Sequence, residues 1–267
     1  MENIYIFVCM PVICVYCFYL GSLCGRNKHR ILWTLPPLLF ILVLYLLSEF
    51  PAIDYLVFPF HIYGRLRFFI PLVPLIFLLG IAAQFRSNAL RRVLYSSIAG
   101  FLIVTYFYIQ YQIVTFDYER LQGRIGVGGC CMQSTGHTCG PAAAVTLLLE
   151  HKIPTFEKQV AKLCGSHPLT GTNEFVLSSV MNHLAMVNNK DVRFKMKKID
   201  FNIIDNELKP FLAIIRLNGM IAHWIVIKEV SGEDITVADP LCGVVKRKKK
   251  DYADIWLKRC IVVDEKE

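Results

Sequence analysis

Four long runs of apolar residues with almost no charge occupy the first 115 residues of the chain. They cover residues 4–23, 31–47, 68–83 and 93–114. A helix needs about 20 mainly apolar residues to cross the ~30 Å hydrocarbon core of a bilayer. The runs therefore predict a membrane domain with four transmembrane helices over residues 1–115.

The composition agrees with a membrane domain of this size. Hydrophobic residues make up 55% of the sequence and the mean hydropathy is +0.46, which is more apolar than a soluble domain needs to be. No basic residue precedes the first run and no small-x-small cleavage site follows it, so we expect an uncleaved anchor. Residues 51–67 are apolar and aromatic but too short to cross, and we expect them at the membrane surface.

The basic residues of the short loops predict which side of the membrane the later residues face. Lysine and arginine gather after the first run and after the third, whereas the regions after the second and fourth runs also contain acidic residues. The two basic loops contain Arg26, Lys28, Arg30, Arg86, Arg91 and Arg92. Because basic loops stay in the cytoplasm, we expect the residues beyond the fourth run on the non-cytoplasmic side of the cell membrane.

Cysteine usage points the other way. The chain has ten cysteines, including the neighbours Cys130 and Cys131, and an oxidising exterior endangers thiols. Cys164, Cys242 or Cys260 are candidates for pairing, although their spacing assigns no partner. The cysteines of the first run say little about redox conditions, so we give the loop charges more weight.

The remaining residues are expected to form a linker and an α+β domain. Residues 116–129 are polar and glycine-rich, which is typical of a flexible connection. Residues 130–267 change from helical patterns to apolar, β-branched runs, with Thr170-Gly171-Thr172 as the expected cap of the last helix. We expect helices over 139–151, 156–164 and 173–187, followed by strands over 192–196, 212–217, 223–230, 234–238, 244–248 and 260–263.

Cys139 stands where the first helix of this domain is expected to begin. Gly140 and Pro141 suit a first helical turn, and apolar helix formers follow them. A helix start favours the thiolate over the thiol, and the thiolate is the form that attacks a carbonyl carbon. Gln133 lies a short loop upstream, so its amide and the backbone N–H of Cys139 are able to form an oxyanion hole.

A thiol nucleophile needs a base, and the base needs a third group to orient it. His223 opens an apolar, β-branched run, and Asp239 closes the next one after a turn at residues 231–234. Neighbouring strands present an imidazole and a carboxylate side by side at one end of a sheet. The sequence therefore predicts a triad of Cys139, His223 and Asp239, with Gln133 as an oxyanion donor.

Each of these residues has a simpler explanation when taken alone. A cysteine is more often buried and structural, a strand histidine is more often hydrogen-bonded in place, and Asp239 before Pro240 suits a turn. Their joint order favours catalysis. A zinc site using Cys130, Cys131 and Cys139 is disfavoured because no paired Cys-x-x-Cys elements support it, and we expect neither a metal nor a cofactor.

The motifs resemble the bacteriocin-processing cysteine peptidases of the C39 type, which have a papain-like fold. The resemblance covers about residues 125–265, and it implies Cys139 as nucleophile, His223 as general base and acid, Asp239 as orienting residue and Gln133 as oxyanion donor. It also implies substrates cut after a small-residue, often double-glycine, leader. The matching places are Gln133 with residues 138–143, His223-Trp224, residues 237–240, and a closing helix and strand over 252–263.

The chain departs from the best-known members of that family, in which the domain belongs to a peptide exporter with an ATP-binding module. The sequence has no glycine-rich loop ending in Gly-Lys-Ser or Gly-Lys-Thr, so we expect no ATP hydrolysis. Export of a cleaved peptide would then require a separate exporter.

A basic run near the end of the sequence contributes much of the net charge of +8. It is Lys246-Arg247-Lys248-Lys249-Lys250. A solvated strand end explains it simply, while contact with anionic lipid head groups is the sharper alternative for a domain tethered to a bilayer. Nucleic acid is not an expected partner, because no aromatic interleaving or binding motif accompanies the charge.

We therefore expect a membrane-anchored cysteine peptidase, a hydrolase acting on a peptide or protein. Two alternatives use the same fold. One is a peptide-binding module without catalysis, and the other is a thiol acyltransferase or amide-forming enzyme with the same acyl-enzyme intermediate. The sequence does not distinguish water from an amine as the acceptor of the acyl group.

Overall fold

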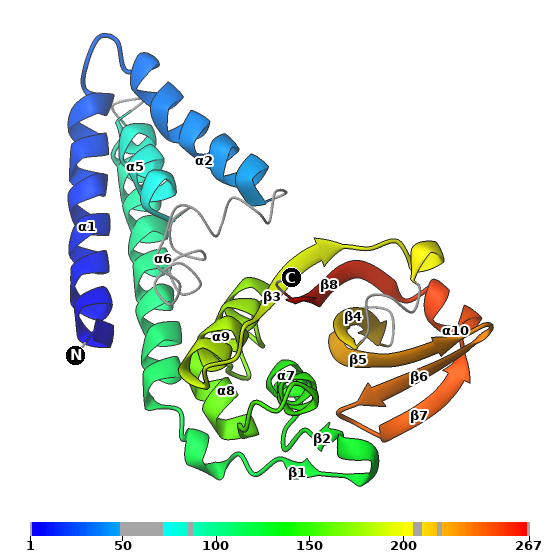
Figure 1. The fold of residues 1–267 in the computed structure, drawn as a ribbon. Coiled ribbons are helices and arrows are strands. Elements are labelled where there is room, and N and C mark those ends of the chain that lie inside the picture. Colours follow the sequence, from blue (N-terminus) through cyan, green and yellow to red (C-terminus); the bar gives the residue numbers. More distant parts are fainter. Residues whose placement is uncertain (1, 49–71, 85–87, 205–209, 218–220, 266–267) are drawn as a thin grey trace. The chain divides into compact units, whose positions relative to one another are not determined.

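The computed structural model describes residues 2–48, 72–84, 88–204, 210–217 and 221–265, and it divides into two compact units (Figure 1). The first unit is Met1–Phe116 and the second is Asp117–Glu267. The described part of the first unit is helical, whereas the second combines helices with β-sheets.

The helices of the first unit follow the apolar runs of the sequence. They are α1 (Glu2–Gly25), the 3-10 helix η1 (Leu32–Thr34), α2 (Leu35–Ser48), α5 (Leu72–Ala83) and α6 (Ala89–Thr115). Asn88 caps α6, because its side chain accepts a hydrogen bond from the Leu90 N–H.

The helices of the first unit differ in whether their described residues are long enough to cross a bilayer. Over the residues whose side chains the structure describes, which include only residues 11–25 of α1, one helix, Ala89–Ile113, is long and apolar enough to cross a membrane. The apolar stretches Pro11–Gly25, Leu32–Val43 and Leu72–Ala83 are shorter. The structure thus gives one candidate span where the sequence predicts four, and the expected surface segment 51–67 lies outside the described residues.

Helices α1 and α5 approach each other so closely that only small residues fit at their contact. A Cβ atom on Gly21 would lie 2.2 Å from the carbonyl oxygen of Phe77. One on Gly80 would lie 2.3 Å from the carbonyl oxygen of Phe18. Close backbone contact through glycine is typical of helices that associate inside membranes.

The second unit has three main helices, which match the expected ranges within one residue at each end. They are α7 (Cys139–Glu150), α8 (Glu157–Cys164) and α9 (Glu174–Val187). The expected cap of α9 is wrong by one residue. The side chain of Asn173 accepts hydrogen bonds from the N–H groups of Phe175 and Val176, so Asn173 caps the helix instead of the Thr170-Gly171-Thr172 stretch before it.

Six antiparallel strands form the main sheet, in the order β3-β8-β4-β5-β6-β7. Strands β4 to β7 pair with their neighbours along the chain, whereas β8 lies between β3 and β4. Helices followed by an antiparallel sheet confirm the expected α+β class. The strands are β3 (Val192–Lys198), β4 (Phe211–Leu217), β5 (Ile221–Ser231), β6 (Asp234–Asp239), β7 (Gly243–Lys248) and β8 (Trp256–Glu265).

Each face of this sheet has its own hydrophobic core. Helices α7 and α9 cover one face, where Leu147 and Val226 are completely buried. The other core contains Ile225, together with Tyr252 of the short helix α10 (Lys250–Ala253) and Phe201 of the 3-10 helix η4 (Phe201–Ile203). Because successive residues of β5 enter opposite cores, the strand reads as a continuous apolar run.

The segment before α7 differs from the flexible connection that its composition predicts. It contains η2 (Tyr118–Arg120), β1 (Arg124–Ile125), η3 (Val127–Gly129) and β2 (Cys131–Met132), and β1 pairs with β2. Tyr118 and Leu121 are buried, and Glu119 accepts a hydrogen bond from Lys158 of α8 at 2.7 Å. The second unit therefore starts at Asp117, before residue 130.

Candidate active site

Cys139 is the first residue of α7, as the sequence predicts, and its side chain is half-buried. The loop before it is held by Thr138, whose hydroxyl donates to the Thr135 carbonyl oxygen at 3.0 Å. Gly140 is needed for space, because a Cβ atom there would lie 2.9 Å from the Cβ of Thr172. The chain therefore enters α7 along a fixed path.

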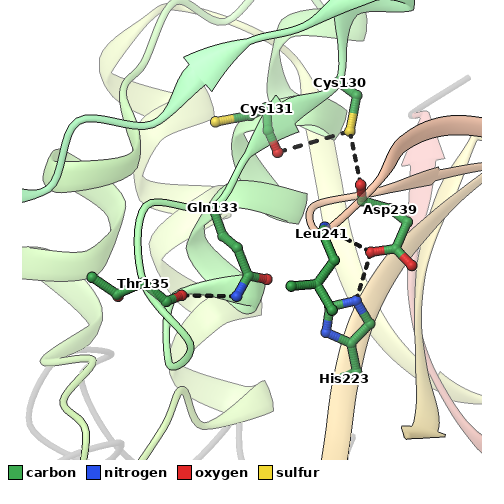
Figure 2. A network of polar contacts seen from close by, with 7 residues as sticks. All are labelled: Cys130, Cys131, Gln133, Thr135, His223, Asp239 and Leu241. Carbon is green, nitrogen blue, oxygen red and sulfur yellow. Dashed lines mark hydrogen bonds and ion pairs between the residues drawn. The ribbon is translucent and has the colours of Figure 1, made fainter.

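His223 and Asp239 come from neighbouring strands and are in direct contact. His223 lies near the start of β5, Asp239 ends β6, and pairing of Val226 with Ala238 brings the two ends together. Nε2 of His223 lies 2.7 Å from Oδ1 of Asp239 (Figure 2). The imidazole is 3% exposed, so this contact is largely shielded from water.

The Cys139 side chain lies close enough to His223 to act on its charge, which brings the helix start and the sheet together. Since Nε2 faces Asp239, Nδ1 is the ring nitrogen left for the sulfur. Burial lowers the pKa of His223, but the interactions with Asp239 and Cys139 outweigh burial and raise this pKa from 6.5 to about 9. The imidazole is therefore protonated at neutral pH.

Asp239 has several donors besides His223. The Leu241 N–H donates to Oδ1 at 2.8 Å, and the Cys242 thiol also hydrogen-bonds to the carboxylate. Burial raises the pKa of Asp239, but these hydrogen bonds, led by that of His223, keep it below its usual range. The thiol of Cys130 lies 3.5 Å from the Asp239 carbonyl oxygen (Figure 2). The carboxylate is thus held as an anion in a fixed orientation.

Gln133 is anchored through both its backbone and its side chain. Its N–H donates to the Pro240 carbonyl oxygen at 3.0 Å, next to Asp239. Its amide Nε2 donates to the Thr135 carbonyl oxygen at 2.8 Å (Figure 2). An amide nitrogen has two hydrogens, so one remains for a further acceptor. This arrangement suits an oxyanion donor held in place before substrate arrives.

The structure places the His223 imidazole against the Asp239 carboxylate and the Cys139 side chain near His223, and it ties Gln133 to the turn that follows Asp239. In the described ranges, no cluster of three or more histidine, cysteine or acidic residues has the arrangement of a metal site. Cys130 and Cys131 are buried thiols whose pKa values burial raises to about 11 and about 12. Cys242 and Cys260, which the sequence left open as disulfide partners, are free thiols.

The sequence analysis assigned no role at the candidate site to two residues that lie near it. Cys242 contacts the Asp239 carboxylate, and its nearness to Asp239 in the chain was the available signal. Glu157 accepts a hydrogen bond from the Ser134 N–H beside Gln133, although it is far from the loop in sequence. An acidic residue at the start of a helix is normally explained by the helix dipole, so the sequence gives no sign of this contact.

An α+β domain in which a cysteine at a helix start meets a histidine from an antiparallel sheet has the papain-like fold of cysteine peptidases. The model of the Peptidase C39 family matches residues 129–267, and the chain belongs to this family.

Similar proteins were also found among curated sequences and solved structures. Uncharacterized proteins of Methanothermobacter marburgensis and Methanothermobacter thermautotrophicus are 29% and 26% identical over 135 and 133 residues. These matches cover 51% and 50% of this chain and 87% and 86% of the relatives. A double-glycine-motif protease from an AMS/PCAT transporter, in complex with its leader peptide, has 20% identity and a TM-score of 0.45, covering 55% of this chain and 96% of its own. The peptidase domain of Streptococcus ComA has 16% identity and a TM-score of 0.44, with 51% and 96% covered.

Proposed function

We propose that this protein is a cysteine peptidase that hydrolyses a peptide bond through Cys139, His223 and Asp239. The observation that supports the proposal best is the 2.7 Å contact between the buried His223 imidazole and the Asp239 carboxylate, with the Cys139 side chain near the same imidazole. Membership of the Peptidase C39 family is consistent with the same reaction.

In the first half of the reaction, the Cys139 thiolate attacks the substrate carbonyl carbon and the carbonyl electrons move to the oxygen. The Gln133 amide and the Cys139 backbone N–H hold the resulting oxyanion. When the carbonyl reforms, the C–N bond breaks, and the leaving nitrogen takes the proton of the His223 imidazolium. A thioester on Cys139 and a free amine are the products.

In the second half, His223 acts as a base. Its neutral imidazole takes a proton from water while the water oxygen attacks the thioester carbon. Collapse of the second oxyanion breaks the C–S bond, releases the carboxylic acid and restores the thiolate–imidazolium pair. Asp239 keeps Nε2 engaged throughout, so Nδ1 stays directed at the reacting atoms.

The substrate class in this proposal is a peptide or protein cut after small residues, with a double-glycine leader as the first choice. This choice rests on the resemblance of the motifs around Cys139, His223 and Asp239 to peptidases that process such leaders. A separate exporter would carry the released peptide, since the sequence has no Gly-Lys-Ser or Gly-Lys-Thr loop.

We further propose that the first unit anchors the peptidase in the cell membrane through several helices. Close glycine contacts between α1 and α5 and the outward-facing apolar side chains support this anchoring. From the loop charges, the second unit would lie on the non-cytoplasmic side and would contact lipid through its basic run. The orientation is tested with a reporter that is active only in the cytoplasm, fused after Glu267. Activity of this reporter would contradict the predicted orientation.

The reaction is tested with the full chain and synthetic peptides that place Gly-Gly, Gly-Ala or Ala-Ala before the scissile bond. Cys139→Ala and His223→Ala are each expected to lower turnover by at least about 10³-fold, because each removes a group that bonds or transfers a proton. Asp239→Asn should lose less and keep measurable activity. Cys24→Ala, a half-buried cysteine of the first unit, is the matched control and should turn over normally.

The same experiment separates the two alternatives. A binding module would bind the peptides without Cys139-dependent cleavage, and its Cys139 would react slowly with iodoacetamide near neutral pH. An acyltransferase would give products whose mass contains an added amine in place of water. Undiminished turnover by Cys139→Ala would refute the proposal itself.

A further inference from the structure

Glu157, the first residue of α8, is a buried carboxylate that the proposed reaction does not use. Its exposed fraction is 2%, and its Oε1 accepts a hydrogen bond from the Ser134 N–H at 2.9 Å. Its Oε2 is buried, and the described residues supply no hydrogen-bond partner for it. Burying such a group costs free energy, so stabilising α8 is an insufficient reason for its position.

The backbone around Gln133 is held from two directions. The Gln133 N–H donates to Pro240 at 3.0 Å, and the next N–H, that of Ser134, donates to Glu157 at 2.9 Å. One bond ties the loop to the turn after Asp239, and the other ties it to α8. Since the side chain of Gln133 also bonds back to Thr135 at 2.8 Å, a shift at either anchor moves the amide.

The backbone of Gly123 packs directly against the side chain of Glu157. A Cβ atom on Gly123 would lie 2.6 Å from Oε2 and 2.9 Å from the Cβ of Glu157. The backbone of Gly123 is not in the left-handed region, so the reason for glycine here is the space beside the carboxylate. The carboxylate is thus enclosed between this segment and the loop of Gln133.

We propose that Glu157 is a positioning residue for the oxyanion hole. It fixes the Gln133–Ser134 backbone, so that the Gln133 amide meets the oxygen on which negative charge develops. The inference rests on the proposed role of Gln133. The proposed role is selective. Glu157 assists steps that form an oxyanion, and it leaves the intrinsic reactivity of the Cys139 thiolate unchanged.

Two reactions of Cys139 in the full chain test this selectivity, each corrected for the rate of Cys139→Ala. Acylation by p-nitrophenyl acetate passes through an oxyanion, whereas alkylation by iodoacetamide occurs at a saturated carbon and does not. Glu157→Ala should slow acylation about 10-fold and leave alkylation within about twofold, a smaller loss than removing an oxyanion donor outright. Glu157→Gln keeps an oxygen for the Ser134 N–H and should acylate within about threefold of wild type.

Further variants make the result specific. Gly123→Ala pushes on Oε2 and should reproduce the selective loss of acylation, which also covers the case in which Glu157→Ala fails to fold. Lys158→Ala is the matched control, because Lys158 is the next residue of α8 and its exposed pair with Glu119 does not touch the loop. Gln133→Ala with Glu157→Ala should acylate no more slowly than Gln133→Ala alone.

The possible outcomes separate two failures. Suppose that Gln133→Ala slows acylation. Glu157 is then not a positioning residue if Glu157→Ala and Gly123→Ala acylate at the normal rate or slow acylation and alkylation equally. The same conclusion holds if adding Glu157→Ala to Gln133→Ala slows acylation further. If Cys139→Ala or Gln133→Ala changes neither rate, the proposed function has failed, and the role of Glu157 fails with it.

Discussion

The two units of this chain place their apolar side chains in opposite ways. In the second unit, residues such as Ile225 and Val226 are completely buried on the two faces of the sheet. In the first unit, Val15 and Phe101 are 60% and 69% exposed, and glycines let α1 and α5 approach closely. An apolar exterior is stable only where the surroundings are apolar, so the difference is consistent with the proposal that the first unit lies in a membrane.

Glycine has a different purpose in each unit. Gly21 and Gly80 let two helix backbones touch, as in helix pairs that pack without a hydrophobic driving force. Gly123 and Gly140 instead make room for the side chains of Glu157 and Thr172 next to the candidate active site. The first use packs two helices together, and the second shapes the surroundings of the candidate site.

The largest expected effect comes from a charge placed in the core of the second unit. Ile225→Asp puts an unpaired carboxylate into a fully buried position and should cost about 3–5 kcal/mol of the free energy of unfolding. Ile203→Asp changes a residue that is 63% exposed in the same unit and should be nearly neutral. Thermal unfolding of the full chain in detergent measures both, and equal losses would contradict the assignment of inside and outside.

A charge on the outside of the first unit should be costly only in lipid. Val104 is 66% exposed on α6, and Val104→Asp should oppose membrane insertion by about 2.5–3.5 kcal/mol if α6 spans the bilayer. The membrane-inserted fraction after expression is the measurement. Normal insertion of Val104→Asp would mean that α6 does not cross the hydrocarbon core.

The glycine contact of the first unit gives a smaller effect with a clear sign. Gly80→Ala places a Cβ atom 2.3 Å from a backbone oxygen and should destabilise the unit by about 1–3 kcal/mol. Gly100→Ala in α6 meets nothing within 4 Å and should be neutral or slightly stabilising. Heat-induced unfolding in detergent compares the two, and equal behaviour would argue against close packing of α1 on α5.

The smallest expected effect concerns pH and should be confined to the second unit. His223, with its pKa raised to about 9, carries the proton needed by the leaving group below that pH and loses it above. Turnover should therefore fall about tenfold per pH unit above about pH 9, equally in detergent and in lipid vesicles. An alkaline limit near pH 6.5 would show that His223 is not paired as described.

Much of the second unit was predictable from sequence because its local signals agree with one another. The apolar helix after Cys139 and the β-branched runs after His223 have clear periods, and Asp239 had only to be placed at the end of the neighbouring strand. The catalytic roles of Cys139, His223 and Asp239 remain predictions. The number of membrane crossings also remains a prediction.

Other features were not predictable, because composition does not reveal tertiary contacts. The glycines of residues 116–129 suggest flexibility, yet the segment folds onto the second unit and Gly123 gives space to Glu157. Asn173 caps α9 although Thr170 and Thr172, whose side chains also suit an N-cap, lie just before it.

The position of β8 between β3 and β4 affects when this protein acquires its fold during synthesis. In a nascent chain on the ribosome, β4 to β7 are able to pair with one another before β8 has emerged. Strand β3 joins them only through β8, and such non-local pairing is slow to form. A ribosome that stalls before Trp256 therefore leaves β3 unattached to the rest of the sheet, and the incomplete product is a target for cellular proteases.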